Sequence, residues 1–86
     1  MRPPSEPPPS GVECLRYIMR YGERHLTADG IKQYPSKNMV HQVAPGGLGF
    51  LLSGRWLKLV NDSVVPQPKA QAWWIRQKGT YGPRGV

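Results

Sequence analysis

The stretch from residue 48 to residue 60, LGFLLSGRWLKLV, constrains the fold more than any other part of the chain, because its hydrophobic period changes partway along. Leu48, Leu51 and Leu52 are spaced i, i+3, i+4, which predicts a short helix with one buried face. Gly54 favours a helix end in the left-handed conformation. A helix is therefore expected to stop at Gly54 and give way to a different element.

The residues after Gly54 alternate with a period of two, which is typical of a half-buried strand. In this strand Leu57 and Leu59 are expected to point one way, and Trp56, Lys58 and Val60 the other. A second strand is expected at 71–76, QAWWIR, with Trp73 and Trp74 on opposite faces. Asn61-Asp62-Ser63 has turn chemistry, and Pro66 and Pro68 are expected to keep the connection to Lys69 out of the ladder.

Two helices are expected before this region. The first spans 12–21, with Ser10 as N-cap, an apolar face on Leu15, Ile18 and Met19, and an end at Gly22. The second spans about 28–34, with Thr27 as N-cap and Pro35 as terminator. Residues 24–26 between them could add a minor third strand.

Residues 36–44 allow two interpretations, a short helix capped by Ser36 or an extended segment. Pro45-Gly46-Gly47 breaks whatever precedes it, and the next helix is expected over about 46–53. The proline-rich residues 1–11 predict a disordered tail, residues 12–76 one small domain, and residues 77–86 a flexible basic tail.

Three segments in this order resemble the winged helix-turn-helix DNA-binding domains of bacteria and phages. LRYIMRYG at 15–22 looks like their first helix, and LTADGI at 26–31 resembles the opening of their second helix. LLSGRWL at 51–57 is similar to the end of their recognition helix running into the wing. The resemblance implies an α+β fold, a three-helix winged helix-turn-helix with a two- to three-stranded antiparallel β-wing. Pro45-Gly46-Gly47 departs from the family, so the recognition helix is either split or confined to the piece after Pro45.

The charge distribution predicts a polyanionic partner. The net charge is +7, and residues 1–30 carry four basic and four acidic side chains. Residues 31–86 carry eight basic side chains against Asp62 alone, so the whole excess lies there. Nucleic acid is the favoured partner, with an anionic membrane or an acidic protein as alternatives.

The candidate DNA-binding residues follow from the resemblance and from side-chain chemistry. Asn and Gln can pair with adenine and Lys with guanine, while basic side chains on the wing contact phosphates. Ser36 and the amides near Gly46 and Gly47 could hold a phosphate at a helix N-terminus. The candidates are Ser36, Lys37, Asn38, His41, Gln42, Arg55, Lys58, Lys69, Arg76 and Lys78. An ordinary polar helix surface and a solvated sheet edge are the competing interpretations.

Enzymatic, metal and membrane functions have little support in the sequence. The five acids show no paired spacing, and Cys14, His25 and His41 lack both metal-ligand spacing and a third orienting group. No catalytic residue, metal site or small-molecule cofactor is expected. The longest apolar run is too short to span a bilayer, and a single cysteine fits a reducing cytoplasm.

The sequence therefore predicts a small transcriptional regulator that binds double-stranded DNA sequence-specifically and acts by occupying its site. A homodimer is compatible with this function, since target symmetry usually mirrors protein symmetry. Two alternatives stay open. One is a protein-interaction module on a winged-helix scaffold, and the other is an RNA-binding subunit of a ribonucleoprotein.

Overall fold

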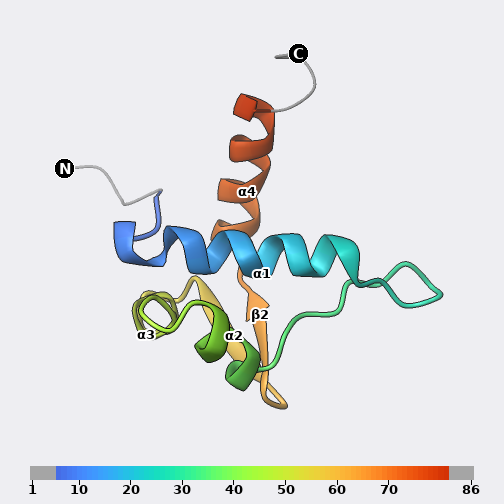
Figure 1. The fold of residues 1–86 in the computed structure, drawn as a ribbon. Coiled ribbons are helices and arrows are strands. Elements are labelled where there is room, and N and C mark those ends of the chain that lie inside the picture. Colours follow the sequence, from blue (N-terminus) through green and yellow to red (C-terminus); the bar gives the residue numbers. More distant parts are fainter. Residues whose placement is uncertain (1–5, 82–86) are drawn as a thin grey trace.

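The computed structural model describes residues 6–81, and the side chains of residues 6–78. The elements along the chain are the 3-10 turn η1 (Pro9–Gly11), the helices α1 (Val12–Arg24), α2 (Lys37–Val43) and α3 (Leu48–Ser53), the strands β1 (Leu57–Val60) and β2 (Ser63–Pro66), and the helix α4 (Pro68–Tyr81). Helix α1 crosses the middle of the molecule, with α4 extending from one side and α2, α3 and the hairpin on the other (Figure 1). The α+β class and the two-stranded antiparallel hairpin are confirmed.

Helix α1 is longer than the sequence predicts, because Gly22 lies inside it instead of ending it. A Cβ on Gly22 would lie 2.3 Å from a ring carbon of Tyr34, so the glycine lets that ring pack against the helix. The predicted N-cap is wrong: Gly11 takes the position, without a side-chain hydrogen bond, instead of Ser10. The predicted apolar face of Leu15, Ile18 and Met19 is fully buried, as expected.

The helix predicted over 28–34 is wrong, because this segment forms a turn within an open loop. Leu26 and Lys32 form an isolated antiparallel bridge, and Gly30 between them has a φ of 81°. The Thr27 hydroxyl accepts hydrogen bonds from the backbone N–H groups of Asp29 and Ile31, which favours a local turn over a helix. Ile31, the large apolar side chain of this segment, is 63% exposed.

Of the two interpretations of residues 36–44, a short helix and an extended segment, the structure has the helix. Ser36 is the N-cap of α2, and its hydroxyl accepts from Met39 N at 3.2 Å. Helix α3 begins at Leu48, after a break at Pro45-Gly46-Gly47. Gly54 has a φ of −83°, so the left-handed residue at this end is Arg55 (φ 64°), contrary to expectation.

The hairpin uses a different second strand from the one the sequence predicts. Strand β1 pairs with β2, with Leu57 opposite Pro66 and Val60 opposite Ser63. The two residues between them, Asn61 and Asp62, both have positive φ, which matches the tight turn that right-twisted hairpins prefer. Residues 71–76, predicted as a strand, lie in α4, and Pro66 belongs to the ladder rather than to a loop.

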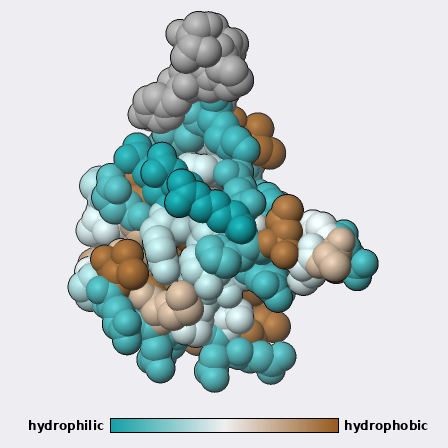
Figure 2. Space-filling model, turned by 45° about the vertical axis from the view of Figure 1, so that its right-hand side comes forward, coloured by the Kyte–Doolittle hydropathy of each residue, from teal (hydrophilic) through white to brown (hydrophobic). Residues whose placement is uncertain are grey.

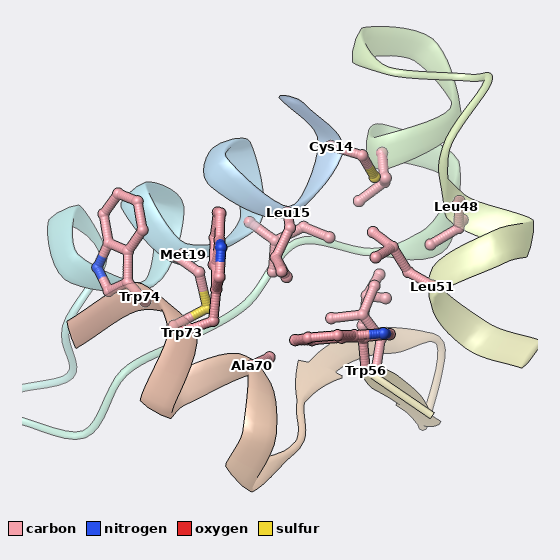
Figure 3. Close-up of a cluster of buried hydrophobic side chains, with 13 residues drawn as sticks. Cys14, Leu15, Met19, Leu48, Leu51, Trp56, Ala70, Trp73 and Trp74 are labelled. Atoms are coloured by element: carbon pink, nitrogen blue, oxygen red, sulfur yellow. The ribbon is translucent and has the colours of Figure 1, made fainter. Parts of the chain in front are cut away.

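The tryptophans form much of the core, and their predicted placement changes with α4. Trp73 and Trp74 are both buried on one helical face, not on opposite faces of a strand. Trp73 lies beside Met19 of α1, while Trp56 lies near Leu51 and Ala70 (Figure 3). Trp56, expected on the same side of the strand as Lys58, is buried because it precedes β1 and packs against this cluster.

The two predicted tails are partly structured. Residues 1–5 and 82–86 lie outside the described residues. Pro7 and Gly11 are buried, and Trp73 Nε1 donates to Glu6 Oε1 at 3.2 Å, so residues 6–11 pack on the domain. Residues 77–81 continue α4. Within residues 6–81, no helix is long and apolar enough to cross a membrane.

Candidate nucleic-acid interface

Helix α2 presents most of the side chains expected to read bases. Its core-facing residue is Val40, which is fully buried. Lys37, Asn38, His41 and Gln42 are exposed, and the i, i+4 spacing of Asn38 and Gln42 places them one above the other. The helix therefore carries a continuous polar edge with donors and acceptors.

The hairpin lies against the N-terminal end of α2. The Lys37 backbone N–H donates to Asp62 O at 2.8 Å, and Ser36 and Ser63 form an antiparallel bridge. A surface hollow of about 280 Å³ is lined by Ser36, Lys37, Asn38 and Asp62. These contacts fix the position of the polar edge relative to the hairpin.

The phosphate cradle expected at Ser36, Gly46 and Gly47 is not assembled. The Ser36 hydroxyl accepts the hydrogen bond that caps α2, and Asp62 places an acidic group in the same hollow. Gly47 is buried, and a Cβ there would lie 2.6 Å from Ser10 O. Close packing against residues 10–11 therefore explains this glycine, without any anion.

The basic residues expected around the wing separate into two groups. Arg55 and Lys58 are exposed, at the end of α3 and on β1 respectively. Lys69, Arg76 and Lys78 lie on α4 rather than beside a second strand. Lys69 Nζ lies 4.7 Å from the Trp56 ring centroid, and Lys78 Nζ pairs with Glu23 Oε2 at 2.6 Å. The structure therefore gives Lys69 and Lys78 intramolecular contacts.

Glu23 joins α1 to α4 through two donors. Its Oε2 accepts from Trp74 Nε1 at 2.8 Å and from Lys78 Nζ. Partial burial raises the pKa of this carboxyl, but the hydrogen bonds from Lys78 and Trp74 and the nearby positive charges outweigh burial and lower it overall. Lys78 therefore stabilises the domain in this structure.

Cys14, His25 and His41 are the side chains that nucleophilic or metal chemistry would use, and Cys14 is buried. Burial raises the pKa of the Cys14 thiol to about 11, so it is protonated at neutral pH. His25 follows α1 and His41 lies on α2, and both are exposed. In the part of the chain that the structure describes, no three His, Cys, Asp or Glu side chains are grouped to hold a metal ion.

A second basic surface lies on α1, and the total charge of residues 1–30 does not reveal it, because their basic and acidic side chains balance. Arg16, Arg20 and Arg24 are spaced i, i+4, i+8 along the solvent side of this helix, and Tyr17, Tyr21 and His25 follow the same spacing beside them. We call these six residues the Arg–Tyr face. The i, i+4, i+8 spacing of the three arginines is the feature of the sequence that identifies this face.

Comparisons of this chain with protein-family models, with curated proteins and with solved structures find no match. The functional argument therefore depends on the geometry and chemistry of the surfaces described above.

Proposed function

We propose that the chain is a winged helix-turn-helix domain in which α2 and α3 form the helix-turn-helix and the β1–β2 hairpin forms the wing. The order of the elements supports this assignment, since α1 precedes the helix pair and the hairpin follows α3 directly. In this arrangement residues 44–47 are the turn between the two helices. The first helix of the helix-turn-helix motif is then α2, and not the loop at 26–31 that resembled this helix in sequence.

We infer that the domain binds double-stranded DNA through α2 and the wing. One observation carries the inference: the exposed polar edge of α2 is held directly against the hairpin, through Lys37 N–H to Asp62 O. Asn38 and Gln42 can pair with adenine in the major groove, and Lys37 and His41 flank them. Arg55 and Lys58 would contact phosphates, which add affinity without sequence information.

The helix that enters the major groove in the proposed interface is not the one that enters it in the usual helix-turn-helix. The second helix of the motif normally reads bases. Here that helix is α3, whose sequence LGFLLS offers only the Ser53 hydroxyl as a polar side chain, and this hydroxyl donates to Gly49 O. We therefore assign base reading to α2, and the remaining α4 candidates, including Arg76, to structural or peripheral roles.

The variant Asn38→Ala/Gln42→Ala tests this assignment against a duplex selected for tight binding from a random pool. If these side chains read bases, the double variant should lose about 1–3 kcal/mol per base contact on the selected duplex and little on random DNA. Gln71→Ala, an exposed glutamine on α4, is the matched control. Equal losses on both duplexes, or none, would contradict base reading by α2.

A second candidate function is favoured by one observation. Phe50, on α3, is 57% exposed at the position where a recognition helix would face DNA, and Val43 at the end of α2 is 58% exposed. These side chains suit a protein-interaction module on the same scaffold. Such a module would tolerate loss of Asn38 and Gln42 and fail with Phe50→Ser, whereas the DNA-binding domain should show the opposite pattern.

The biological role that we propose is transcriptional regulation by site occupancy in the cytoplasm, with or without a homodimer. An RNA-binding subunit of a ribonucleoprotein is the remaining alternative. Competition between duplex DNA and single-stranded RNA for the α2 surface separates these two functions, because a single strand has no major groove for α2 to enter.

A further inference from the structure

The Arg–Tyr face of α1 has a continuous basic row. Helical spacing sets Arg16, Arg20 and Arg24 roughly 6 Å apart along the helix axis. Arg16 pairs with Glu13 at 3.0 Å, on a carboxyl side chain that is itself 82% exposed. Among residues 6–81, Arg20 and Arg24 are exposed and form no ion pair. Two guanidinium groups are therefore free to bind an anion.

An aromatic row runs beside the arginines. Tyr17 and Tyr21 meet edge to face at 5.9 Å, and the Tyr21 and His25 rings stack at 3.8 Å. His25 Nδ1 lies 2.9 Å from Tyr21 O, so an N–H on that nitrogen donates to the carbonyl and fixes the ring. One face of the exposed His25 ring covers Tyr21, and its opposite face can extend the stack.

Both rows line one hollow. Its volume is about 420 Å³, and its lining consists of the six residues of the Arg–Tyr face together with Glu13. Figure 2 shows strongly hydrophilic residues across the middle of the molecule in that view, with hydrophobic residues in separate patches. Charged and stacking groups are thus combined on one accessible surface.

We propose that the Arg–Tyr face is a second nucleic-acid site, and that it binds single-stranded nucleic acid. Single-strand binding surfaces combine cations that follow the backbone with aromatic rings on which unpaired bases stack. Arg20 and Arg24 bind successive phosphates, for which guanidinium groups are well suited. An unpaired base stacks on the free face of His25, a contact that a paired base in a duplex cannot offer.

Tyr21 is the residue by which the Arg–Tyr face borders α2 and the hairpin, since its Oη lies 4.0 Å from Met39 Sδ and it lines a hollow with Val60 and Asn61. Arg20, Arg24 and His25 do not line that hollow. The two surfaces can therefore be impaired one at a time, and the failure of one proposal leaves the other intact.

Fluorescence anisotropy with the full 86-residue chain tests the proposal. The probes are oligothymidylate and oligouridylate of about 12 nucleotides, within the site sizes known for single-strand binders, and a duplex of the same length. Arg20→Gln/Arg24→Gln removes two charges from α1, and Arg55→Gln/Lys58→Gln removes two from the wing side as a charge-matched control. Glutamine keeps the helix propensity of α1 close to that of arginine.

The proposal predicts that the two double variants differ in their affinity for the single-stranded probes. Arg20→Gln/Arg24→Gln should weaken single-strand binding by on the order of tenfold and reduce its logarithmic salt slope by about 1.4, while duplex binding stays unchanged. The wing variant should leave single-strand binding unchanged. His25→Ala should weaken single-strand binding by about fivefold or more through lost stacking.

Three outcomes would overturn the proposal: no binding of either oligonucleotide at low salt, equal losses in both double variants, or no loss in Arg20→Gln/Arg24→Gln. Circular dichroism verifies that each variant is folded. If the arginine variant does not fold, His25→Ala decides alone, because His25 is exposed and lies after the helix. Tighter binding of one oligonucleotide identifies whether the natural strand is DNA or RNA.

Discussion

The neighbouring glycines Gly46 and Gly47 differ in what surrounds them, and they provide a matched pair at the residue scale. A Cβ on Gly47 would lie 2.6 Å from Ser10 O and 2.9 Å from Gly11 Cα, both backbone atoms, whereas a Cβ on Gly46 meets nothing within 4 Å. Gly47→Ala should therefore lower the free energy of unfolding by about 1–3 kcal/mol, because residues 10–11 must move. Gly46→Ala should change it by no more than about 0.5 kcal/mol.

Urea denaturation of the two alanine variants makes this comparison. Equal stabilities of Gly46→Ala and Gly47→Ala would show that residues 10–11 do not pack on the α2–α3 turn. That result would also remove the packing explanation for Gly47.

A second prediction at the residue scale concerns the reactivity of the Cys14 thiol. Burial raises the pKa of its thiol from 9.0 to about 11. At pH 8 the thiolate fraction should then be about 100-fold lower than for an ordinary cysteine. Iodoacetamide should alkylate the folded protein at least that much more slowly than the protein in urea, as measured by mass spectrometry. Comparable rates in the two states would place the thiol at the surface.

At the scale of elements, Glu23 adds polar contacts to the apolar packing between α1 and α4. Although burial raises the pKa of this carboxyl, hydrogen bonds from Lys78 and Trp74 bring it below the ordinary value of 4.5. The ionised Glu23 carboxylate therefore stabilises the folded state above pH 4.5. This stabilisation is lost as the pH falls through the lowered pKa that Glu23 has in the folded protein. Glu23→Gln should cost about 1 kcal/mol at pH 7, with screening reducing the value of a partly exposed site.

The sign of this effect is checked by thermal unfolding of wild type and Glu23→Gln at a series of pH values. The difference in stability should be present at neutral pH and shrink below pH 4.5. Glu13→Gln is the control on the same helix, since its exposed pair with Arg16 should contribute within about 0.5 kcal/mol. A difference that persists unchanged at low pH would contradict the ionic role of Glu23.

Some elements were readable from the sequence, and the errors have physical causes. The apolar stripe of α1 and the helix that ends before Gly54 were predicted because their periodicity is clear. The strand predicted over 71–76 is a run of six residues that was expected to pair with the strand before it, but Ala70, Trp73, Trp74 and Gln77 follow the helical spacing i, i+3, i+4, i+7. A short apolar run does not distinguish a strand from a helix, and the longer window decides between them.

The loop at 25–33 and the hairpin turn show the limits of local sequence signals. Thr27 and Asp29 suit a helix start, yet Thr27 uses its hydroxyl to close a turn with Gly30 at positive φ. The sequence predicts a turn at Asn61-Asp62 but not its conformation. Both residues have positive φ in the structure, and this tight turn makes Ser63–Pro66 the partner of β1.

The candidate site was partly predictable for similar reasons. Ser36, Lys37, Asn38, His41 and Gln42 were singled out by side-chain type, and the structure brings them together on or beside α2. The intramolecular contacts of Lys69 and Lys78 could not be foreseen, because they depend on where α4 packs. The Arg–Tyr face was hidden by a charge total that averages over opposite sides of a helix.

At the scale of the whole molecule, charge is distributed over more than one surface. Basic residues lie on or beside α2 and the hairpin, on the Arg–Tyr face and on α4. Basic residues on separate faces predict that duplex DNA and single-stranded nucleic acid bind at different surfaces. Sequence-specific binding would then depend on α2, and the total affinity on the number of phosphates contacted.

A titration of a random DNA duplex at about 50 and 200 mM salt tests the central claim most directly. If Lys37, Arg55 and Lys58 contact three phosphates, the affinity should fall by roughly 40-fold between these concentrations. The salt slope of the Arg55→Gln/Lys58→Gln variant should be shallower by about 1.8. No duplex binding at the lower salt, or binding that is insensitive to salt, would contradict the account of this protein as a DNA-binding domain.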